Sequence, residues 1–427
     1  MNLLKRIGKN TFSSLQIRNY RLYFIGQSIS LCGTWMQTIG QGLLVLQLTG
    51  SGTALGLVTA LQFLPILFLG PYGGIIADRF SKRKILFISQ ATAGLLALIL
   101  GLLVLSGSIR LWMVYFLALC LGLVNTFDNP VRQSFVVEMV GHKQVPNAVS
   151  LNSSLVNLAR IIGPVFAGVL IAAAGLAVCF LVNAVSYIAV LIVLFLMRPQ
   201  DLLTAPRTQR AKGQLREGFR YVRSTPVLRN TLLMMAIIGT LSYEFQVILP
   251  LFAEFTFHGN ARTYADLTAA MGLGALIGGL ISANRKNISS SMIVTAAFIF
   301  GITMLLVSIA PSLPVALAAM VLVGIFSINY MSLSNTTLQL ESAPGMRGRV
   351  MALWSVAFLG STPIGGPIVG WLGEHIGPRW GLAVGGFAAI AAAGIGAALL
   401  KNGKHHIQPN IEVDPTESPV ERTYKIS

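Results

Sequence analysis

Long apolar runs separated by short polar turns make up most of the chain. An α-helix needs about 20 apolar residues to cross a bilayer, and twelve runs reach that length. The pattern therefore predicts twelve spanning helices, with ends accurate to a few residues. They lie near residues 22–48, 52–77, 85–106, 109–136, 146–173, 175–197, 230–254, 263–284, 288–310, 313–338, 347–372 and 378–400.

The composition supports this pattern. Of the 427 residues, 54% are hydrophobic and 11% are charged, and the mean hydropathy is +0.72. A soluble protein carries about 25% charged residues, so the fold class is an all-α integral membrane protein. A net charge of +17 would also suit a nucleic-acid-binding protein. Because the basic residues lie in short loops between apolar runs, we expect a bilayer and no nucleic acid as the partner.

The distribution of basic residues predicts the topology. Cytoplasmic loops are rich in Lys and Arg. With twelve spans and both termini in the cytoplasm, this side holds all but four of the 31 basic residues, the exceptions being Arg110, Arg160, Arg262 and Arg379. Adding or removing one helix would destroy this bias. We therefore expect a multi-pass protein of the cell inner (cytoplasmic) membrane.

The chain divides into two similar halves. We expect an N-terminal six-helix bundle over 1–197, a cytoplasmic linker over 198–229, a C-terminal bundle over 230–400 and a disordered tail over 401–427. A shift of 203 residues places Gly163-Pro164 on Gly366-Pro367, as in parallel repeats related by an axis along the membrane normal. Residues 213–223 suit either a basic helix on the inner leaflet or a solvated linker.

A basic turn between the second and third runs resembles a known signature. Its sequence is Gly73-Gly74-Ile75-Ile76-Ala77-Asp78-Arg79-Phe80-Ser81-Lys82-Arg83-Lys84. It is similar to the signature loop of the major facilitator superfamily, with Ser81 where that pattern usually has Gly. The resemblance implies that the loop latches the cytoplasmic ends of the two halves together, through Gly74, Asp78, Arg79 and Arg83. The alternative is that these bases only enforce topology.

A second motif resembles that of one branch of this superfamily. Asp128 and Arg132 lie four residues apart and would share a helix face, although Pro130 disturbs that helix. Together with Arg160-Ile161-Ile162-Gly163-Pro164, this motif is similar to the branch that contains the enterobactin exporter and the macrolide efflux pumps, which are drug:proton antiporters. The similarity runs from about Tyr20 to Leu400. For Asp128 we favour a structural partner of Arg79 and Arg132 over a proton carrier.

The glycine and proline residues of the fifth run resemble the antiporter motif of the superfamily. They are Gly163, Pro164 and Gly168, and Gly366-Pro367 occupies the same place in the second half. Small residues allow close helix packing, and Pro removes a backbone donor. A generic packed helix explains the glycines alone, but not the repeated Gly-Pro.

Glu244 is the acid that lies deepest in a predicted span of the second half. An ionisable residue inside a span is costly unless it is paired or hydrated. Two interpretations stay open: Glu244 couples protons or binds substrate, or it forms a buried structural pair, with Arg160 as the base at comparable depth.

Uncharged polar residues mark the faces expected to line a substrate cavity. In transporters that this chain resembles, helices 1, 4, 7 and 10 line the cavity. The alternative is hydrogen bonding between helices. The candidate cavity residues are Gln37, Gln41, Asn125, Tyr243, Asn329 and Asn335.

No motif indicates a cofactor, a metal site or an ATP-driven mechanism, since the five histidines lie outside the predicted spans and no phosphate-binding glycine loop is present. We therefore expect a secondary active transporter, a monomer by resemblance, that exports an amphipathic drug or siderophore in exchange for protons. The alternatives are an importer of a nutrient or siderophore on the same fold and, less favoured, a membrane enzyme.

Overall fold

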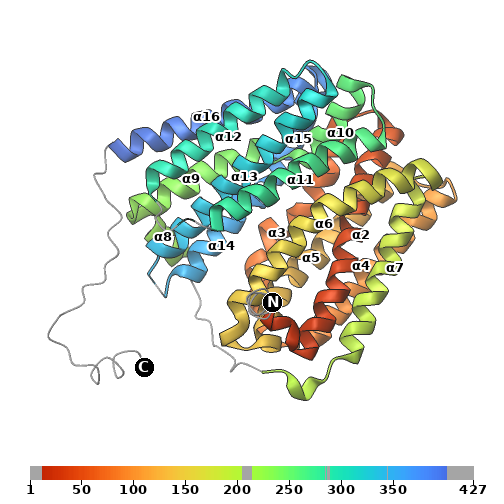
Figure 1. The fold of residues 1–427 in the computed structure, drawn as a ribbon, viewed down its shortest axis with the longest axis vertical. Helices are drawn as coiled ribbons and strands as arrows, with labels where there is room; N and C mark the ends of the chain where they lie inside the picture. Colours follow the sequence, from red (N-terminus) through yellow and green to blue (C-terminus); the bar gives the residue numbers. More distant parts are fainter. Residues whose placement is uncertain (1–11, 204–213, 284, 286–288, 344, 402–427) are drawn as a thin grey trace, which may run out of the picture.

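The computed structural model describes residues 12–203, 214–283, 285, 289–343 and 345–401, with their side chains except at 71–79, 142, 214–216, 283 and 400–401. All regular structure in this part of the chain is helical (Figure 1). The first half contains α2 (Arg18–Thr49), α3 (Gly52–Arg79), α4 (Lys82–Leu105), α5 (Leu111–Val140), α6 (Val145–Ala174) and α7 (Leu176–Leu196). The rest contains α8 (Gln214–Ser224), α9 (Pro226–Leu241), α10 (Phe245–Leu251), a π-helical turn Phe252–Thr256, α11 (Ala261–Ala283), α12 (Ser290–Ser308), α13 (Leu313–Glu341), α14 (Arg347–Phe358), α15 (Thr362–His375) and α16 (Pro378–Lys401).

Eleven segments of the described chain are long and apolar enough to cross a membrane, so the protein is a multi-pass membrane protein. Helix α2 is not among them, although it is continuous over 32 residues. Its sequence carries Gln27, Gln37 and Gln41, which are buried inside the protein and lower its hydropathy. The count of twelve spans and their division into two six-helix bundles stay predictions.

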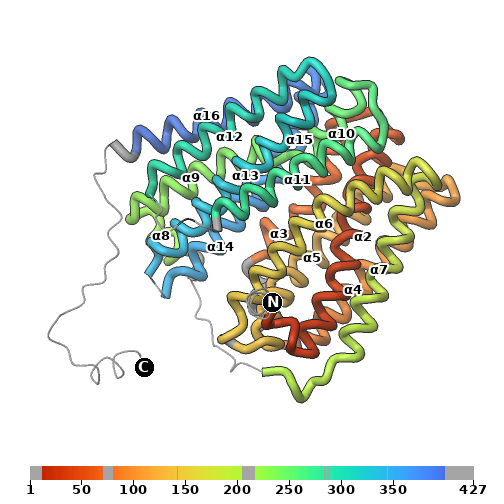
Figure 2. Tube along the Cα trace, in the orientation of Figure 1, coloured from red at the N-terminus to blue at the C-terminus, as the bar shows by residue number. Residues whose placement is uncertain are grey.

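The two halves of the chain lie side by side, with the red-to-yellow helices next to the green-to-blue ones (Figure 2). Within the first half, α4 packs on α7, α3 on α5, and α2 on α6 and α7. Within the second half, α11 packs on α13 and α12 on α16. The main contacts between the halves join α3 to α15 and α6 to α11.

Glycines bring α3 and α15 into backbone contact. A Cβ atom added to Gly52 would lie 2.5 Å from the carbonyl oxygen of Gly370, and one added to Gly56 would lie 2.7 Å from the carbonyl carbon of Gly366. Only glycine allows so close an approach. We call Gly52, Gly56, Gly366 and Gly370 the glycine seam. The two ends of the molecule are named the Gly52 end and the Arg79 end, after the two ends of α3.

Beyond the glycine seam, Glu374 of α15 caps the start of α3. Its Oε2 atom accepts hydrogen bonds from the hydroxyl groups of Ser51 (2.7 Å) and Thr53 (2.6 Å) and from the backbone N–H of Thr53 (2.9 Å). The first N–H groups of a helix lack partners within the helix and favour an anion. This Glu374 cap therefore ties the two halves together at the Gly52 end.

Two of the predicted spans are interrupted. Helix α9 ends at Leu241 and α10 begins at Phe245, while α14 ends at Phe358 and α15 begins at Thr362. Ser242 follows the last residue of α9, and its hydroxyl donates a hydrogen bond to the carbonyl of Gly385 (2.7 Å). The two interruptions lie close together, since a Cβ atom on Gly239 would lie 2.7 Å from the carbonyl oxygen of Ala357.

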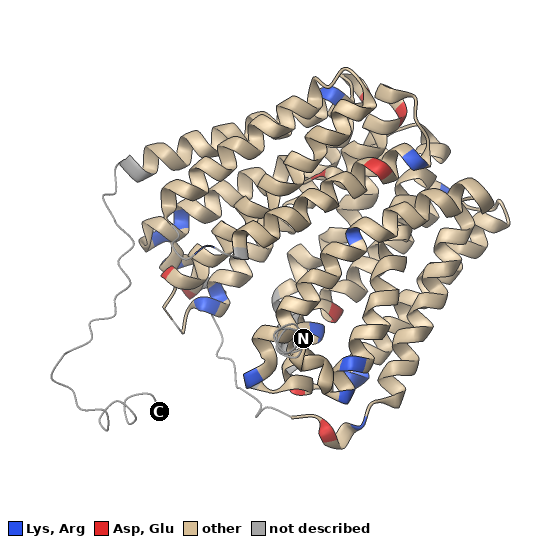
Figure 3. Ribbon diagram, in the orientation of Figure 1, with Lys and Arg blue, Asp and Glu red and all other residues tan. Residues whose placement is uncertain are grey.

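The predicted linker contains a helix, which is one of the two alternatives that the sequence left open. Helix α8 spans Gln214–Ser224 and packs on α9 and α14, with an ion pair between Glu217 and Arg349 (2.9 Å). Helix α9 begins inside the predicted linker, and the predicted tail lies outside the described residues beyond Lys401. Figure 3 shows that the charged residues concentrate at the two ends of the molecule, with few at mid-height.

Candidate functional site

A cavity of about 310 Å³ lies inside the molecule. It is lined mainly by α2, α3, α4, α5 and α7, and the second half contributes Gln246 and Leu359. Among the described residues that line it, Arg132 is the charged side chain and none is a carboxylate. Eight of the lining residues carry carboxamides: Gln37, Gln41, Gln62, Gln90, Asn125, Asn129, Asn183 and Gln246.

Three of the six predicted cavity residues, Gln37, Gln41 and Asn125, line this cavity, and the other three do not. The Tyr243 hydroxyl donates a hydrogen bond to the carbonyl of Ser327 (2.7 Å), and its ring packs among phenylalanines. Asn329 accepts a hydrogen bond from Ser282 at 3.4 Å, and Asn335 accepts one from Gln339 at 2.5 Å.

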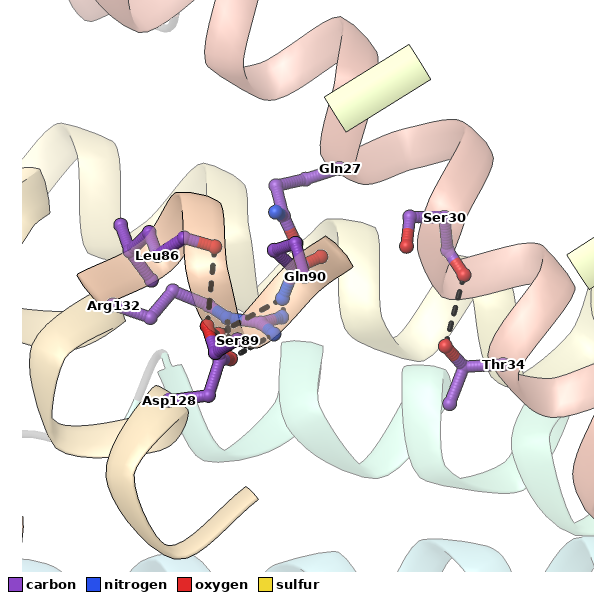
Figure 4. Close-up of polar contacts among 8 residues, drawn as sticks. All are labelled: Gln27, Ser30, Thr34, Leu86, Ser89, Gln90, Asp128 and Arg132. Atoms are coloured by element: carbon purple, nitrogen blue, oxygen red, sulfur yellow. Dashed lines mark hydrogen bonds and ion pairs between the residues drawn. The ribbon is translucent and has the colours of Figure 1, made fainter. Parts of the chain in front are cut away.

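The Asp128 carboxylate is the centre of a buried polar cluster (Figure 4), two members of which, Gln90 and Arg132, line this cavity. One oxygen accepts hydrogen bonds from the Ser89 hydroxyl (2.5 Å) and the Gln90 amide (2.9 Å). The other pairs with the Arg132 guanidinium, whose Nε lies 2.9 Å away. Helix α5 continues through Pro130, so the proline does not prevent this pairing.

The cluster satisfies both charges within the first half. The Arg132 guanidinium also donates to the side-chain oxygen of Gln27 on α2 (2.9 Å). Buried charges are tolerated only when their hydrogen bonds are made. A structural role for Asp128 agrees with this geometry. Ser89 and Gln90 were not identified from the sequence, because nothing in the spacing of α4 marks them as partners of a residue on another helix.

The predicted latch is only partly described. At Gly74, Asp78 and Arg79 the structure describes only the helical backbone. Arg83 donates hydrogen bonds to the carbonyls of Leu194 (2.7 Å) and Phe195 (3.1 Å) at the end of α7, a favourable position for a cation. Arg83 thus binds within the first half, and its predicted role between the halves stays a prediction.

Glu244 lies at the break between α9 and α10. Its side chain is 3% exposed, and its Oε1 atom has no hydrogen-bond partner among the described residues. The Thr362 side chain interacts with the carboxyl group, and a Cβ atom on Gly365 would lie 2.9 Å from Oε1. The carboxyl group of Glu244 therefore lies next to the part of α15 that forms the glycine seam.

Arg160 lies apart from Glu244. No ion pair joins these two described residues, so the structure does not bring together the buried pair considered from the sequence. The guanidinium carbon lies 5.2 Å from the ring centre of Trp35 on α2. Its Nε atom is buried and has no hydrogen-bond partner in the part of the chain that the structure describes.

The residues of the antiporter motif lie at helix contacts. A Cβ atom on Gly163 would lie 2.5 Å from the Cβ of Trp35 on α2, and one on Gly168 would lie 3.1 Å from the Cβ of Ala265 on α11. Pro164 is buried beside Gly163. Gly366 and Pro367 face Gly56 across the glycine seam. The motif thus supplies one contact within the first half and two between the halves.

A family model described as transmembrane secretion effector matches residues 9–417. The chain belongs to this family of the major facilitator superfamily. The staphyloferrin A transporter of Staphylococcus aureus is 27% identical over 341 residues, which cover 78% of this chain and 84% of that protein. The enterobactin exporter of Escherichia coli (strain K12) is 23% identical over 402 residues, covering 93% and 96%. These relatives are transporters, not enzymes.

Solved structures share the fold. A bacterial homologue of the human lysosomal transporter Spinster, inward-facing and occupied, superposes with a TM-score of 0.70 at 15% identity and covers 91% of this chain and 97% of its own. The nucleoside transporter NupG gives 0.70 at 12% identity, covering 90% and 99%. At these identities the likeness extends to the fold of major facilitator transporters and no further.

Proposed function

We propose that the protein is a secondary active exporter that moves an amphipathic organic small molecule across the inner membrane in exchange for protons. The carboxamide-lined cavity of about 310 Å³ carries this proposal, because a few hundred Å³ is the size of a small-molecule site. Carboxamides both donate and accept hydrogen bonds, which suits an oxygen-rich organic ligand. The siderophore relatives make siderophores the first class to test, ahead of drugs.

Alternating access would follow from rocking the two halves about this cavity. In the proposed orientation the Arg79 end faces the cytoplasm, together with both termini, and the loop over residues 73–84 latches that side when the Gly52 end is open. The glycine seam and the Glu374 cap would hold the Gly52 end closed in the state described here.

Glu244 is the proposed proton-coupling residue. It is a buried acid at a helix break, next to the seam that must open and close. In other secondary transporters, substrates and ions bind where spanning helices are interrupted. Protonation would remove the cost of keeping a charge at this site, so the proton would favour one arrangement of the seam.

The experiment uses proteoliposomes loaded with a candidate siderophore and an imposed pH gradient. Glu244→Gln, which mimics the protonated acid, should abolish uphill efflux and retain downhill exchange. Glu254→Gln, an acid of the same span that is partly exposed, is the matched control and should retain both activities. Normal uphill efflux by a well-folded Glu244→Gln variant would refute the coupling role.

Import is the second candidate function, because one relative is named only as a transporter. A comparison of cells with and without the protein separates the two directions. Accumulation of substrate in wild-type cells relative to cells that lack the protein would favour import, and retention in the cells that lack it would favour export.

A further inference from the structure

We infer that Arg160, held in place by Trp35, binds an anionic group of the transported molecule, a carboxylate or a similarly planar oxyanion. This inference rests on the proposed transport function and names the substrate class: an organic anion. It concerns a site between α6, which does not line the carboxamide cavity, and α2, which does.

The first argument is the depth of the two side chains. Arg160 lies at the middle of α6 (Val145–Ala174), and Trp35 lies at the middle of α2 (Arg18–Thr49). Thr34 and Gln37, which flank Trp35 on α2, line the cavity. Tyr243 of the second half is close enough to interact electrostatically with the guanidinium. Arg160 therefore lies near mid-membrane, where the two halves meet.

The second argument is the uncompensated charge. Arg132, the other arginine at depth in the first half, has its charge balanced by Asp128. None of the described acids pairs with Arg160, and no described residue accepts a hydrogen bond from its Nε. A cation at this depth without a counter-ion is costly. An anion that arrives with the substrate would supply the missing charge.

The third argument is the geometry of the guanidinium. The cation lies over the Trp35 ring, with its central carbon 5.2 Å from the ring centre, which is within the range of an attractive cation–π contact. This contact occupies one face, and the Nε–H group has no hydrogen-bond partner among the described residues. The N–H edges of a guanidinium match a carboxylate in a bidentate arrangement. Trp35 therefore orients the group without consuming its hydrogen-bond donors.

The test compares two probes that differ in charge, 2,3-dihydroxybenzoate and 2,3-dihydroxybenzamide. Their binding to the purified, detergent-solubilised protein is measured by calorimetry at constant ionic strength. The wild type should bind the carboxylate roughly tenfold more tightly, as expected for charge-assisted hydrogen bonds. Arg160→Gln should bring this ratio close to one, whereas Arg160→Lys should keep part of it.

Two further variants make the test specific. Arg262→Gln removes an arginine whose side chain is 82% exposed and should keep the full ratio. Trp35→Leu keeps the charge of Arg160 but removes its support, so the ratio should fall. The inference is overturned if the wild type shows no preference for the carboxylate or binds neither probe. It is equally overturned if Arg160→Gln retains the preference or, should that variant not fold, if Trp35→Leu retains it.

Binding of these probes does not require transport. A wild-type protein that prefers the carboxylate but exports nothing in proteoliposomes would contradict the proposed function and leave the anion site standing. A protein that exports its substrate but shows no preference between the probes would contradict only the anion site.

Discussion

Removing the Glu374 cap should shift the protein towards a state that is open at the Gly52 end. One carboxylate oxygen accepts three hydrogen bonds from the start of α3, at 2.6 to 2.9 Å. Loss of an N-terminal cap costs about 1 kcal/mol, with a range of roughly 0.5–2, and the exposure of Glu374 favours the lower part of this range. A change of about 0.5–1 kcal/mol corresponds to about a two- to fivefold change in the ratio of open to closed molecules.

The assay measures the distance between spin labels on the two halves at this end. Labels at Ser108, between α4 and α5, and at Ser312, before α13, would report the opening, in a protein whose native cysteines Cys32, Cys120 and Cys179 are replaced. Glu374→Ala should increase the long-distance population about two- to fivefold. Asp266→Ala is the control, because this acid pairs with Arg262 within α11 only. An unchanged distance distribution in Glu374→Ala would refute the capping role.

Two further predictions concern packing and charge. Gly56→Ala should weaken the contact between α3 and α15 by about 1–3 kcal/mol and lower uphill transport. Gly70→Ala on the same helix should have little effect, because the nearest atom to an added Cβ lies 3.8 Å away. Equal transport by both variants would contradict the proposed role of the glycine seam. Asp128→Asn should destabilise the protein by about 3–5 kcal/mol, because it leaves the charge of Arg132 uncompensated. Thermal unfolding in detergent measures this loss of stability. The control is Asp266→Asn, which breaks a partly exposed ion pair; equal stability of the two variants would argue against the pairing of Asp128 with Arg132.

The sequence predicted the positions of the helices well, because a bilayer requires long apolar runs. It did not predict the breaks near Glu244 and Ser361, since hydropathy averages over a turn that stays apolar. Spacing within one helix suggested that Asp128 and Arg132 would meet. Their partners on other helices, Gln27 and Gln90, depend on how the helices rotate against one another, which no local pattern records.

The same limit explains the outcome for the buried charges. Glu244 and Arg160 were considered as partners because both lie deep in spans. The structure places Glu244 behind the contact of α3 with α15 and Arg160 against Trp35 on α2. Depth along a helix can be read from a sequence, but the side of the helix on which a neighbour lies depends on tertiary packing.

The glycine seam has a consequence for the speed of transport. At the seam, backbone lies directly against backbone, and glycine has no side-chain rotamers to rearrange when the surfaces separate. Closely packed helix backbones typically contact each other through weak C–H···O interactions, each worth about 0.5–1 kcal/mol. Opening the seam should therefore add little to the energy barrier of the conformational change. The Glu374 cap and the bound ligands, rather than the packing of α3 on α15, should determine how fast the transporter turns over.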